Sequence, residues 1–432
     1  MQHTPVSQGD ADAAFACLAG FERLVLAVSG GPDSLALLFL VAEWKARGGT
    51  TAQVSVVTID HALRPEAAAE AAFVSERSAR LGFPHATLKW VHGEKISSGL
   101  AEAARQARYG LLETHAAALL PKVRTAVVTA HTEHDQAETF LMRLARGSGI
   151  DGLASMARVR PLSPNSEIEL VRPFLIFPKS RLIALLEARS ETWCNDPTNS
   201  NDAYERVRLR AVLETLSGAG IRVDALGRSA RRLGSARDAL SYASREFERT
   251  LSLSLNNNIF ASLDRGAFSQ GPRLLRERVI AGLIGSHGGE TPPPELLEIE
   301  ALVTALETRE RGMATLGGAV ISVGPRVIRI WREEGRIGKD DLRLSPGSRH
   351  LWDNRFWVTT DTVLEHPVSV RALGKAGYKL VNETGPVKEH LPARAVHALP
   401  AFWSGNNLLA VPQLGLCNLQ NGGQGTFASI PK

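Results

Sequence analysis

The chain has 432 residues, of which 44% are hydrophobic and 22% charged, a composition typical of a soluble globular protein with two or three domains. Its net charge of +5 permits a polyanionic partner but does not require one. The three cysteines lie far apart, which excludes a disulfide framework and a Cys-x-x-Cys metal or redox site. We find neither a signal peptide nor an apolar run of the roughly 18 residues that cross a bilayer, so we expect a cytoplasmic protein with no membrane partner.

The N-terminal half alternates short β-branched runs with longer helical patterns. Most separations leave room for a helix, so the sequence predicts right-handed crossovers and a parallel sheet covered by helices on both faces. In such α/β sheets, ligands bind outside the carboxyl ends of the strands. The predicted strands are residues 24–28, 54–59, 86–91, 123–129 and 170–175.

The first predicted strand runs into Ser29-Gly30-Gly31-Pro32-Asp33-Ser34 and then into a helix-like apolar run. Unpaired N–H groups at a helix start, next to two residues without a Cβ, form a seat for phosphate. Pro32 suits the first helical turn, and the Ser29 and Ser34 hydroxyls add donors. A carboxylate beside phosphate needs a cation between them, so Asp33 indicates bound magnesium. On its glycines alone, the loop is better explained as an ordinary strand-to-helix connection.

Polar side chains also follow the second strand and occupy the next helix. Asp60 and His61 end the second strand and, at the same sheet edge, would border the sugar and base of a nucleotide. Arg105 and Arg108 are three residues apart on a predicted helix, so both project from one face. They form either a solvated basic face or a guanidinium pair that binds a phosphate or carboxylate.

Two acids begin the helix after the fourth strand. Asp135 and Glu138 share one helix face beside the carboxyl edge of the sheet, where paired acids can bind magnesium or a substrate ammonium group. His131 and His134 raise the alternative of zinc. That alternative is weak, because the spacing is not His-Glu-x-x-His and no third ligand follows at a typical distance.

The remaining chain is basic, then helical, then rich in glycine, proline and valine. Arg206, Arg208 and Arg210 stand at every second position, so they do not share one helical face, and contacts to a nucleic-acid backbone explain them better than a solvated stripe. The predicted domains are an α/β domain at 1–215, a mainly helical domain at 216–335 and a small β-rich domain at 342–432.

These motifs resemble those of the tRNA(Ile)-lysidine synthases, a family of ATP pyrophosphatases with a Ser-Gly-Gly-x-Asp-Ser (PP-loop) signature. The one departure we note is His134, where many members carry a second aspartate. Further segments similar to the family in order and spacing are 60–64, 102–109, 129–139, 146–153, 172–174, 195–199 and 204–210.

The resemblance implies a PP-loop domain that adenylates the wobble cytidine of an isoleucine tRNA with a CAU anticodon, using ATP and Mg²⁺, and then joins free lysine to it. It implies that the two later domains bind tRNA, and it leaves a homodimer open. The residues implied are Ser29, Gly30, Gly31, Pro32, Asp33, Ser34, Asp60 and His61 for ATP, with Asp33 also holding magnesium through ATP; Asp33 and Asp135 for catalysis; Arg105, Arg108, Asp135 and Glu138 for lysine; and Arg206, Arg208 and Arg210 for tRNA.

Two other functions remain as alternatives. A tRNA thiolation enzyme shares the loop and the adenylation step, but the branch that makes 2-thiocytidine depends on paired cysteines, which this chain lacks. A non-catalytic RNA-binding protein that senses ATP would keep the basic later region but need not retain Asp33, Asp135 and Glu138 together.

Overall fold

A computed structural model describes most of the chain as two compact units, Met1–Arg237 and Asp238–Lys432. The predicted three-domain boundaries stay predictions. The residues described are 4–62, 66–91, 99–164, 166–195, 205–360, 367–384, 391–417 and 427–432.

The first unit is built on a six-stranded sheet. Its strands are β1 (Arg23–Ala27), β2 (Gln53–Asp60), β3 (His85–Lys89), β4 (Thr125–Val128), β5 (Val159–Pro161) and β6 (Glu169–Val171). The order across the sheet is β3-β2-β1-β4-β6-β5, and every pairing is parallel except that of the edge strand β5. The predicted parallel sheet is therefore confirmed, with strand ends that differ by a few residues.

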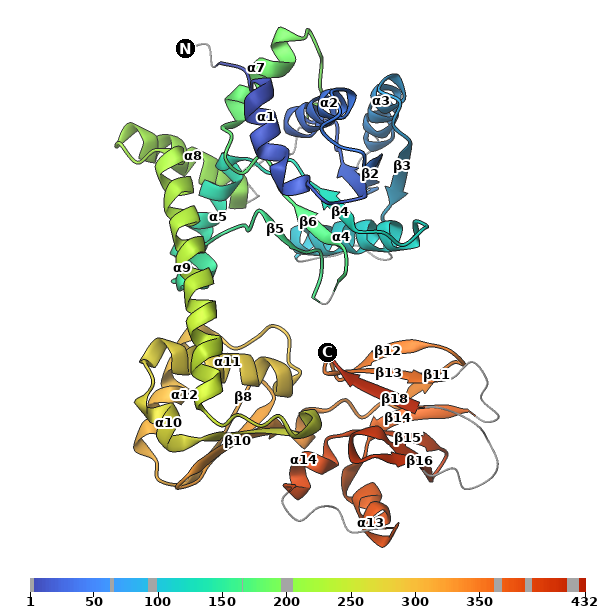
Figure 1. Cartoon of the computed structure of the whole chain (residues 1–432), viewed down its shortest axis with the longest axis vertical. Helices are drawn as coiled ribbons and strands as arrows, with labels where there is room; N and C mark the ends of the chain where they lie inside the picture. Colours follow the sequence, from blue (N-terminus) through green and yellow to red (C-terminus); the bar gives the residue numbers. More distant parts are fainter. Residues whose placement is uncertain are drawn as a thin grey trace. The chain divides into compact units, whose positions relative to one another are not determined.

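Helices cover both faces of this sheet, as Figure 1 shows for α2 and α3 on one face and α4 on the other. The helices of the unit are α1 (Gln8–Phe15), α2 (Pro32–Ala46), α3 (Ala67–Arg80), α4 (Leu100–Ala118), α5 (Glu133–Ala145), α6 (Ile150–Leu153), α7 (Lys179–Ala188), α8 (Glu205–Gly218) and the first part of α9 (Val223–Thr250).

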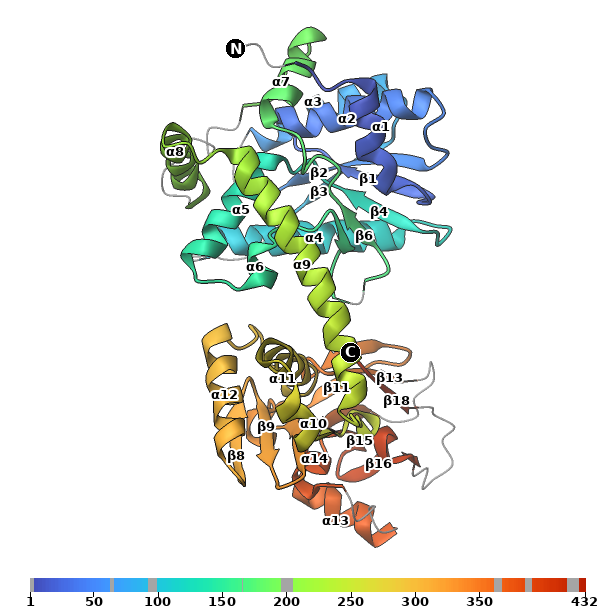
Figure 2. The ribbon, with the colours of Figure 1, turned by 60° about the vertical axis from the view of Figure 1, so that its left-hand side comes forward.

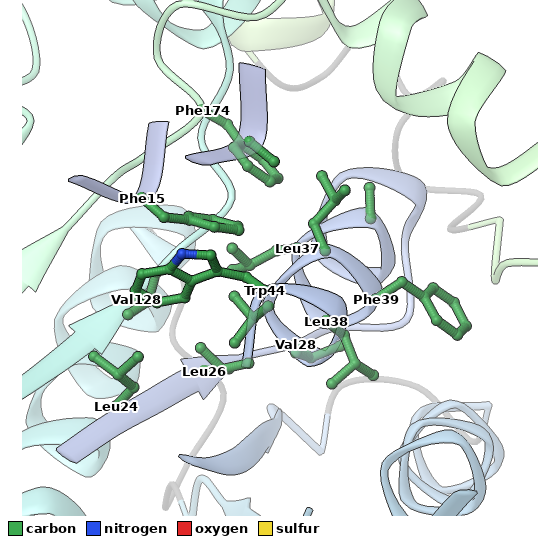
Figure 3. Packing of buried hydrophobic residues seen from close by; sticks show 14 of the residues in the cluster. Phe15, Leu24, Leu26, Val28, Leu37, Leu38, Phe39, Trp44, Val128 and Phe174 are labelled. Atoms are coloured by element: carbon green, nitrogen blue, oxygen red, sulfur yellow. The ribbon is translucent and has the colours of Figure 1, made fainter. Parts of the chain in front are cut away.

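Alternate residues of β1 serve two separate hydrophobic cores. Leu24 and Leu26 belong to a cluster with α1, α2, α3 and α7, part of which is drawn in Figure 3. Val25 and Ala27 belong to a second cluster with Leu112 of α4. Each fully buried leucine contributes roughly 1.5–3 kcal/mol to folding, so the central strand is firmly held between two apolar layers.

The sheet order reverses between β1 and β4, which pair in register from Arg23 opposite Thr125 to Leu26 opposite Val128. The connections from these two strands leave toward opposite faces, so the loops that follow them border one crevice at the carboxyl edge. The glycine-rich loop and the start of α5 are therefore neighbours because of topology.

Two details of the sheet differ from the predicted strands. β6 ends at Val171 rather than 175, because the chain turns at Arg172-Pro173. β5 was not predicted, since three residues are too few to show an alternating pattern.

The second unit combines helices with three antiparallel sheets. The order of the first sheet is β7-β10-β9-β8, and the others are β11-β14-β15-β16-β17 and β12-β13-β18. The fold class predicted for the whole chain is thus confirmed: a parallel-sheet domain, a helical middle region and C-terminal β structure. Its elements after α9 are β7 (Phe260–Asp264), α10 (Arg265–Gln270), α11 (Arg273–Gly288), α12 (Leu296–Thr308), β8 (Gly312–Leu316), β9 (Ala319–Val323), β10 (Val327–Arg332), β11 (Leu342–Leu344), β12 (Arg349–Trp352), β13 (Phe356–Thr360), β14 (Val368–Ala372), α13 (Gly374–Thr384), α14 (Ala393–His397), β15 (Pro400–Ser404), β16 (Asn407–Val411), β17 (Leu416–Cys417) and β18 (Phe427–Pro431).

A buried ion-pair triad lies inside the second unit. Asp353, in the turn between β12 and β13, pairs with Arg332 at 2.7 Å and with Arg355 at 2.7 Å.

Among the described residues, no helix is both long enough and apolar enough to span a bilayer.

Candidate active site

The loop after β1 has the backbone geometry of an anion site. Gly30 adopts a φ of +85°, and Gly31 is the N-cap of α2, with Pro32 as its first residue. A Cβ on Gly30 would lie 3.1 Å from the Cys194 sulfur, so this position needs glycine both for its conformation and for space. The first N–H groups of α2 therefore remain directed at the carboxyl edge of the sheet.

The two serines of the loop bond to the loop itself. The buried Ser34 hydroxyl donates to the Gly31 carbonyl at 2.9 Å and accepts from the Ser29 amide at 3.2 Å. The Ser29 and Ser34 hydroxyl oxygens are 3.3 Å apart. The serines thus hold the shape of the phosphate seat, and their predicted contacts to ATP stay predictions.

Asp33, in the first turn of α2, carries a largely buried carboxylate whose ionised form is electrostatically unfavourable. Its Oδ2 atom lies 3.2 Å from Lys179 Nζ, whereas its buried Oδ1 has no hydrogen-bond partner among the described residues. Burial, reinforced by the negative charge of Asp135 and opposed by Lys179, raises the pKa of Asp33 to about 6. The carboxylates of the two loops are therefore close enough to repel each other.

Lys179 was missed by the sequence reasoning. It is the first residue of α7, which begins shortly after β6, and so it reaches the same sheet edge as Asp33. The available signal was a basic residue following the fifth predicted strand at its carboxyl end.

A cation fits at Asp33, because its unpaired Oδ1 offers a ligand of the type that magnesium prefers. Across the described residues, no three His, Cys, Asp or Glu side chains are grouped to hold a metal, so the zinc alternative at His131 and His134 gains no support. Magnesium at Asp33 would take its other ligands from substrate phosphates and water.

The start of α5 uses Asp135 as part of a capping box. Asp135 Oδ2 accepts hydrogen bonds from the Thr132 amide at 2.7 Å and the Thr132 hydroxyl at 2.9 Å. Just before the helix, His131 Nδ1 lies 2.9 Å from the Thr129 hydroxyl, and burial lowers the pKa of His131. These bonds fix the direction of the Asp135 carboxyl group.

The two acids of α5 have opposite electrostatic environments. Burial acts to raise the pKa of Asp135, but His131 and the hydrogen bonds from Thr132 outweigh it and hold that pKa below its usual value. Burial raises the pKa of Glu138, against the effect of Arg210. Glu138 is only 2% exposed, and its Oε2 atom has no partner among the described residues.

Helix α8 packs against α5 (Figure 2) and brings arginines to these acids. Arg210 Nε lies 2.7 Å from Glu138 Oε1, and the Arg206 charge acts on Asp135. Because the segment is an α-helix, Arg206 and Arg210 are four residues apart on one face. Two of the three arginines predicted to contact tRNA, Arg206 and Arg210, therefore lie near the acids, and the tRNA contacts of all three stay predictions.

The structure also separates the two arginines of α4. The charges of Arg108 and Asp135 interact, whereas Arg105 lines a cavity with Tyr109. Arg108 also acts on His61, whose pKa is lowered first by burial, and whose ring packs edge-on against Trp90 at 5.9 Å.

Some of the predicted motifs lie partly outside the described residues. Asp60 Oδ1 accepts a hydrogen bond from the Ala62 amide at 2.8 Å, and so shapes the turn after β2. The remainder of that motif, 63–65, and the segment 196–204 lie outside the described residues.

Comparison with known proteins finds relatives that match most of the chain. The family model of the PP-loop domain matches residues 7–216. The tRNA(Ile)-lysidine synthase of Ruegeria pomeroyi is 37% identical over 94% of this chain and 94% of its own length, and that of Bradyrhizobium diazoefficiens is 40% identical over 78% and 98%. A solved structure, the U34-tRNA thiolase NcsA from Methanococcus maripaludis, covers 53% of this chain and 77% of its own at 13% identity and a TM-score of 0.44, too distant to bear on function. On the extent of the lysidine synthase matches, the chain belongs to the tRNA(Ile)-lysidine synthase family.

Proposed function

We propose that this chain ligates free lysine to C2 of the wobble cytidine of an isoleucine tRNA with a CAU anticodon, using ATP and releasing AMP and pyrophosphate. It would act in the cytoplasm, where these substrates occur. The alternative of a thiolation enzyme is less favoured, because the three cysteines are far apart in the sequence. A homodimer stays a prediction, which sedimentation of the purified chain tests.

The observation that carries this proposal is the meeting of two loops at the sheet reversal. One offers helix N–H groups and Asp33 to a triphosphate, and the other offers Asp135 and Glu138, whose unpaired Oε2 suits an ammonium group. An anionic and a cationic substrate would therefore bind side by side, as the joining of an activated nucleotide to lysine requires.

In the first step, cytidine O2 attacks the α-phosphorus of ATP, the bond to the bridging oxygen breaks, and pyrophosphate leaves with the electron pair. The backbone donors near Gly31 and the ammonium of Lys179 would stabilise the charge that develops on the leaving group. Lys179 would exchange its contact with Asp33 for one with phosphate as ATP binds.

Magnesium would be held by Asp33 together with the phosphates of ATP, and when bound it supplies charge neutralisation for the departing pyrophosphate. The chain's own part is to orient Asp33, which α2 does by placing this residue in its first turn.

In the second step, the lysine ε-amine attacks C2, and the bond from C2 to the adenylated oxygen breaks to release AMP. An ammonium ion has no lone pair, so it must first lose a proton. Glu138, whose pKa burial raises, is suited to accept that proton, while Asp135 orients the amine and Arg108 binds the lysine carboxylate.

One assay separates the candidate functions: pyrophosphate release measured with tRNA and lysine added singly and together. Lysidine synthesis requires both for turnover. A thiolation enzyme would release pyrophosphate when tRNA is present and lysine is absent. An ATP-sensing RNA-binding protein would release no pyrophosphate under any of these conditions. Turnover that ignores lysine would refute the proposal.

A further inference from the structure

The helix α4 and the strand β5 border a cavity of about 380 Å³ that the proposed mechanism does not use. Its lining includes Arg105 and Tyr109 of α4 and Arg160 of β5. The volume lies at the small end of the range of ligand cavities, roughly 300–1,000 Å³, and so suits a single nucleotide unit.

Two guanidinium groups flank the Tyr109 ring in this cavity. The Cζ atom of Arg105 lies 5.2 Å from the ring centroid and that of Arg160 lies 5.8 Å from it. Over the described ranges of the chain, neither arginine has a carboxylate within ion-pair distance. Arg160 Nη1 donates only to the backbone carbonyls of Pro161 and Leu162, at 2.9 and 3.2 Å.

Two carboxylates, Glu102 and Glu113, also line the cavity, and each accepts a hydrogen bond from a neutral side chain. Glu113 accepts a hydrogen bond from the Ser163 hydroxyl at 2.7 Å, and Glu102 accepts one from the Gln106 amide at 3.4 Å. The lining therefore carries two positive and two negative side chains, and among the described residues neither carboxylate lies within ion-pair distance of an arginine.

Two further arginines, Arg108 and Arg172, bring positive charge close to the Tyr109 ring. Burial is the main cause that lowers the pKa of Arg108 and of Arg172, which is only 1% exposed. Repulsion from neighbouring arginines lowers both pKa values further. Although burial acts to raise it, the charges of Arg105, Arg108 and Arg172 hold the pKa of Tyr109 below its usual value. An anion would relieve the repulsion among them.

We propose that this cavity binds one of the two nucleotides that flank the wobble cytidine, with its phosphodiester between Arg105 and Arg160 and its base against Tyr109. Arginines recognise phosphate through paired N–H donors, and unstacked RNA bases pack on aromatic rings and guanidinium planes. A base and a phosphate on one strand match an aromatic ring between two arginines.

Helix α4 carries residues of both the cavity and the proposed reaction centre. Arg105 and Arg108 are three residues apart, about 4.5 Å along the axis of α4, and Arg108 interacts with Asp135. A cytidine at the acids would thus place its neighbour on the strand near Arg105. The inference rests on the proposed function, because it takes the wobble cytidine as the substrate.

The test uses the full chain and an anticodon stem-loop of the CAU isoleucine tRNA, with binding measured by fluorescence anisotropy at several salt concentrations. Arg160→Gln is expected to weaken binding about five- to tenfold and to reduce the salt slope by about 0.7, the loss of one single-strand phosphate contact. KM for lysine should not change. Arg124→Gln, on the exposed arginine just before β4, is the control.

A protein–RNA double-mutant cycle locates the contact. A neutral methylphosphonate replaces one phosphate next to the wobble nucleotide, on either side in turn. Weaker binding by the wild type, with no further loss in Arg160→Gln or in Arg105→Gln, supports the proposal at that position.

Three results would overturn the inference. The first is that the losses of affinity from the methylphosphonate and from the arginine substitution add at both phosphate positions. The second is an unchanged RNA affinity in both arginine variants, and the third is that both variants differ from the wild type only in how strongly pyrophosphate inhibits them. Failure of the proposed function is a separate result, since it appears as an absence of lysidine in the wild-type reaction while the binding cycle is read independently.

Discussion

Replacing Asp33 by Asn is expected to stabilise the folded chain while removing its activity. The pKa of this carboxyl is raised from 3.8 to about 6, so near pH 8 the folded state bears the full cost of the ionised group. A difference of about two pKa units corresponds to about 3 kcal/mol. The side chain is 23% exposed, so solvent screening reduces this value only modestly.

The sign of the effect depends on pH. A raised folded-state pKa favours the protonated fold, and that contribution to stability is lost as pH rises through about 6. The gain from Asp33→Asn should therefore be about 3 kcal/mol at pH 8, about half of that at pH 5, and near zero below pH 4. Urea unfolding of the full chain in EDTA at pH 8 and pH 5 measures it, with lysidine formation assayed in parallel.

The matched control is Glu214→Gln, an exposed carboxylate on α8, which should change stability by less than about 0.5 kcal/mol at either pH. An Asp33→Asn variant that is no more stable than the wild type at pH 8, or equally stabilised at both pH values, would show that burial does not raise this pKa, and the reasoning would fail.

Four further substitutions test the rest of the site. Asp135→Asn should abolish lysidine formation but leave tRNA affinity within about twofold, with about 1 kcal/mol lost from the cap; normal turnover would refute its assignment. Lys179→Gln should slow pyrophosphate release at least about tenfold without changing KM for lysine, and an equal rise in that KM would contradict a role at phosphate. Gly30→Ala should cost roughly 1–3 kcal/mol through its left-handed backbone and weaken ATP binding in equilibrium dialysis. Arg210→Gln should cost about 2 kcal/mol in urea unfolding by leaving Glu138 buried without its partner, and adding Glu138→Gln should restore most of it; a double variant no better than the single would exclude coupling.

Local sequence signals accounted for the fold and for the edge at which the site lies. Alternating apolar runs predicted the parallel strands, and the glycine pair predicted a close approach of backbone to ligand. The Thr132-x-x-Asp135 spacing of a capping box was also readable, although the prediction gave Asp135 only catalytic and ligand-binding roles.

What could not be predicted depends on contacts between distant segments. Lys179 meets Asp33, and Arg210 meets Glu138, only after α7 and α8 fold back onto the sheet edge. Arg206, Arg208 and Arg210 were expected not to share one helical face, but the first and last of them are four residues apart in α8 and do align. No local pattern encodes such pairings.

The capping box at α5 limits how Asp135 can act. Its Oδ2 is already committed to the amide and hydroxyl of Thr132, so a substrate can use only Oδ1. This carboxylate therefore cannot chelate an ion through both oxygens, and under the proposed function a lysine nitrogen at Oδ1 would take a second anionic contact from Glu138. Selectivity for an amine over a divalent ion would thus follow from the way the helix begins.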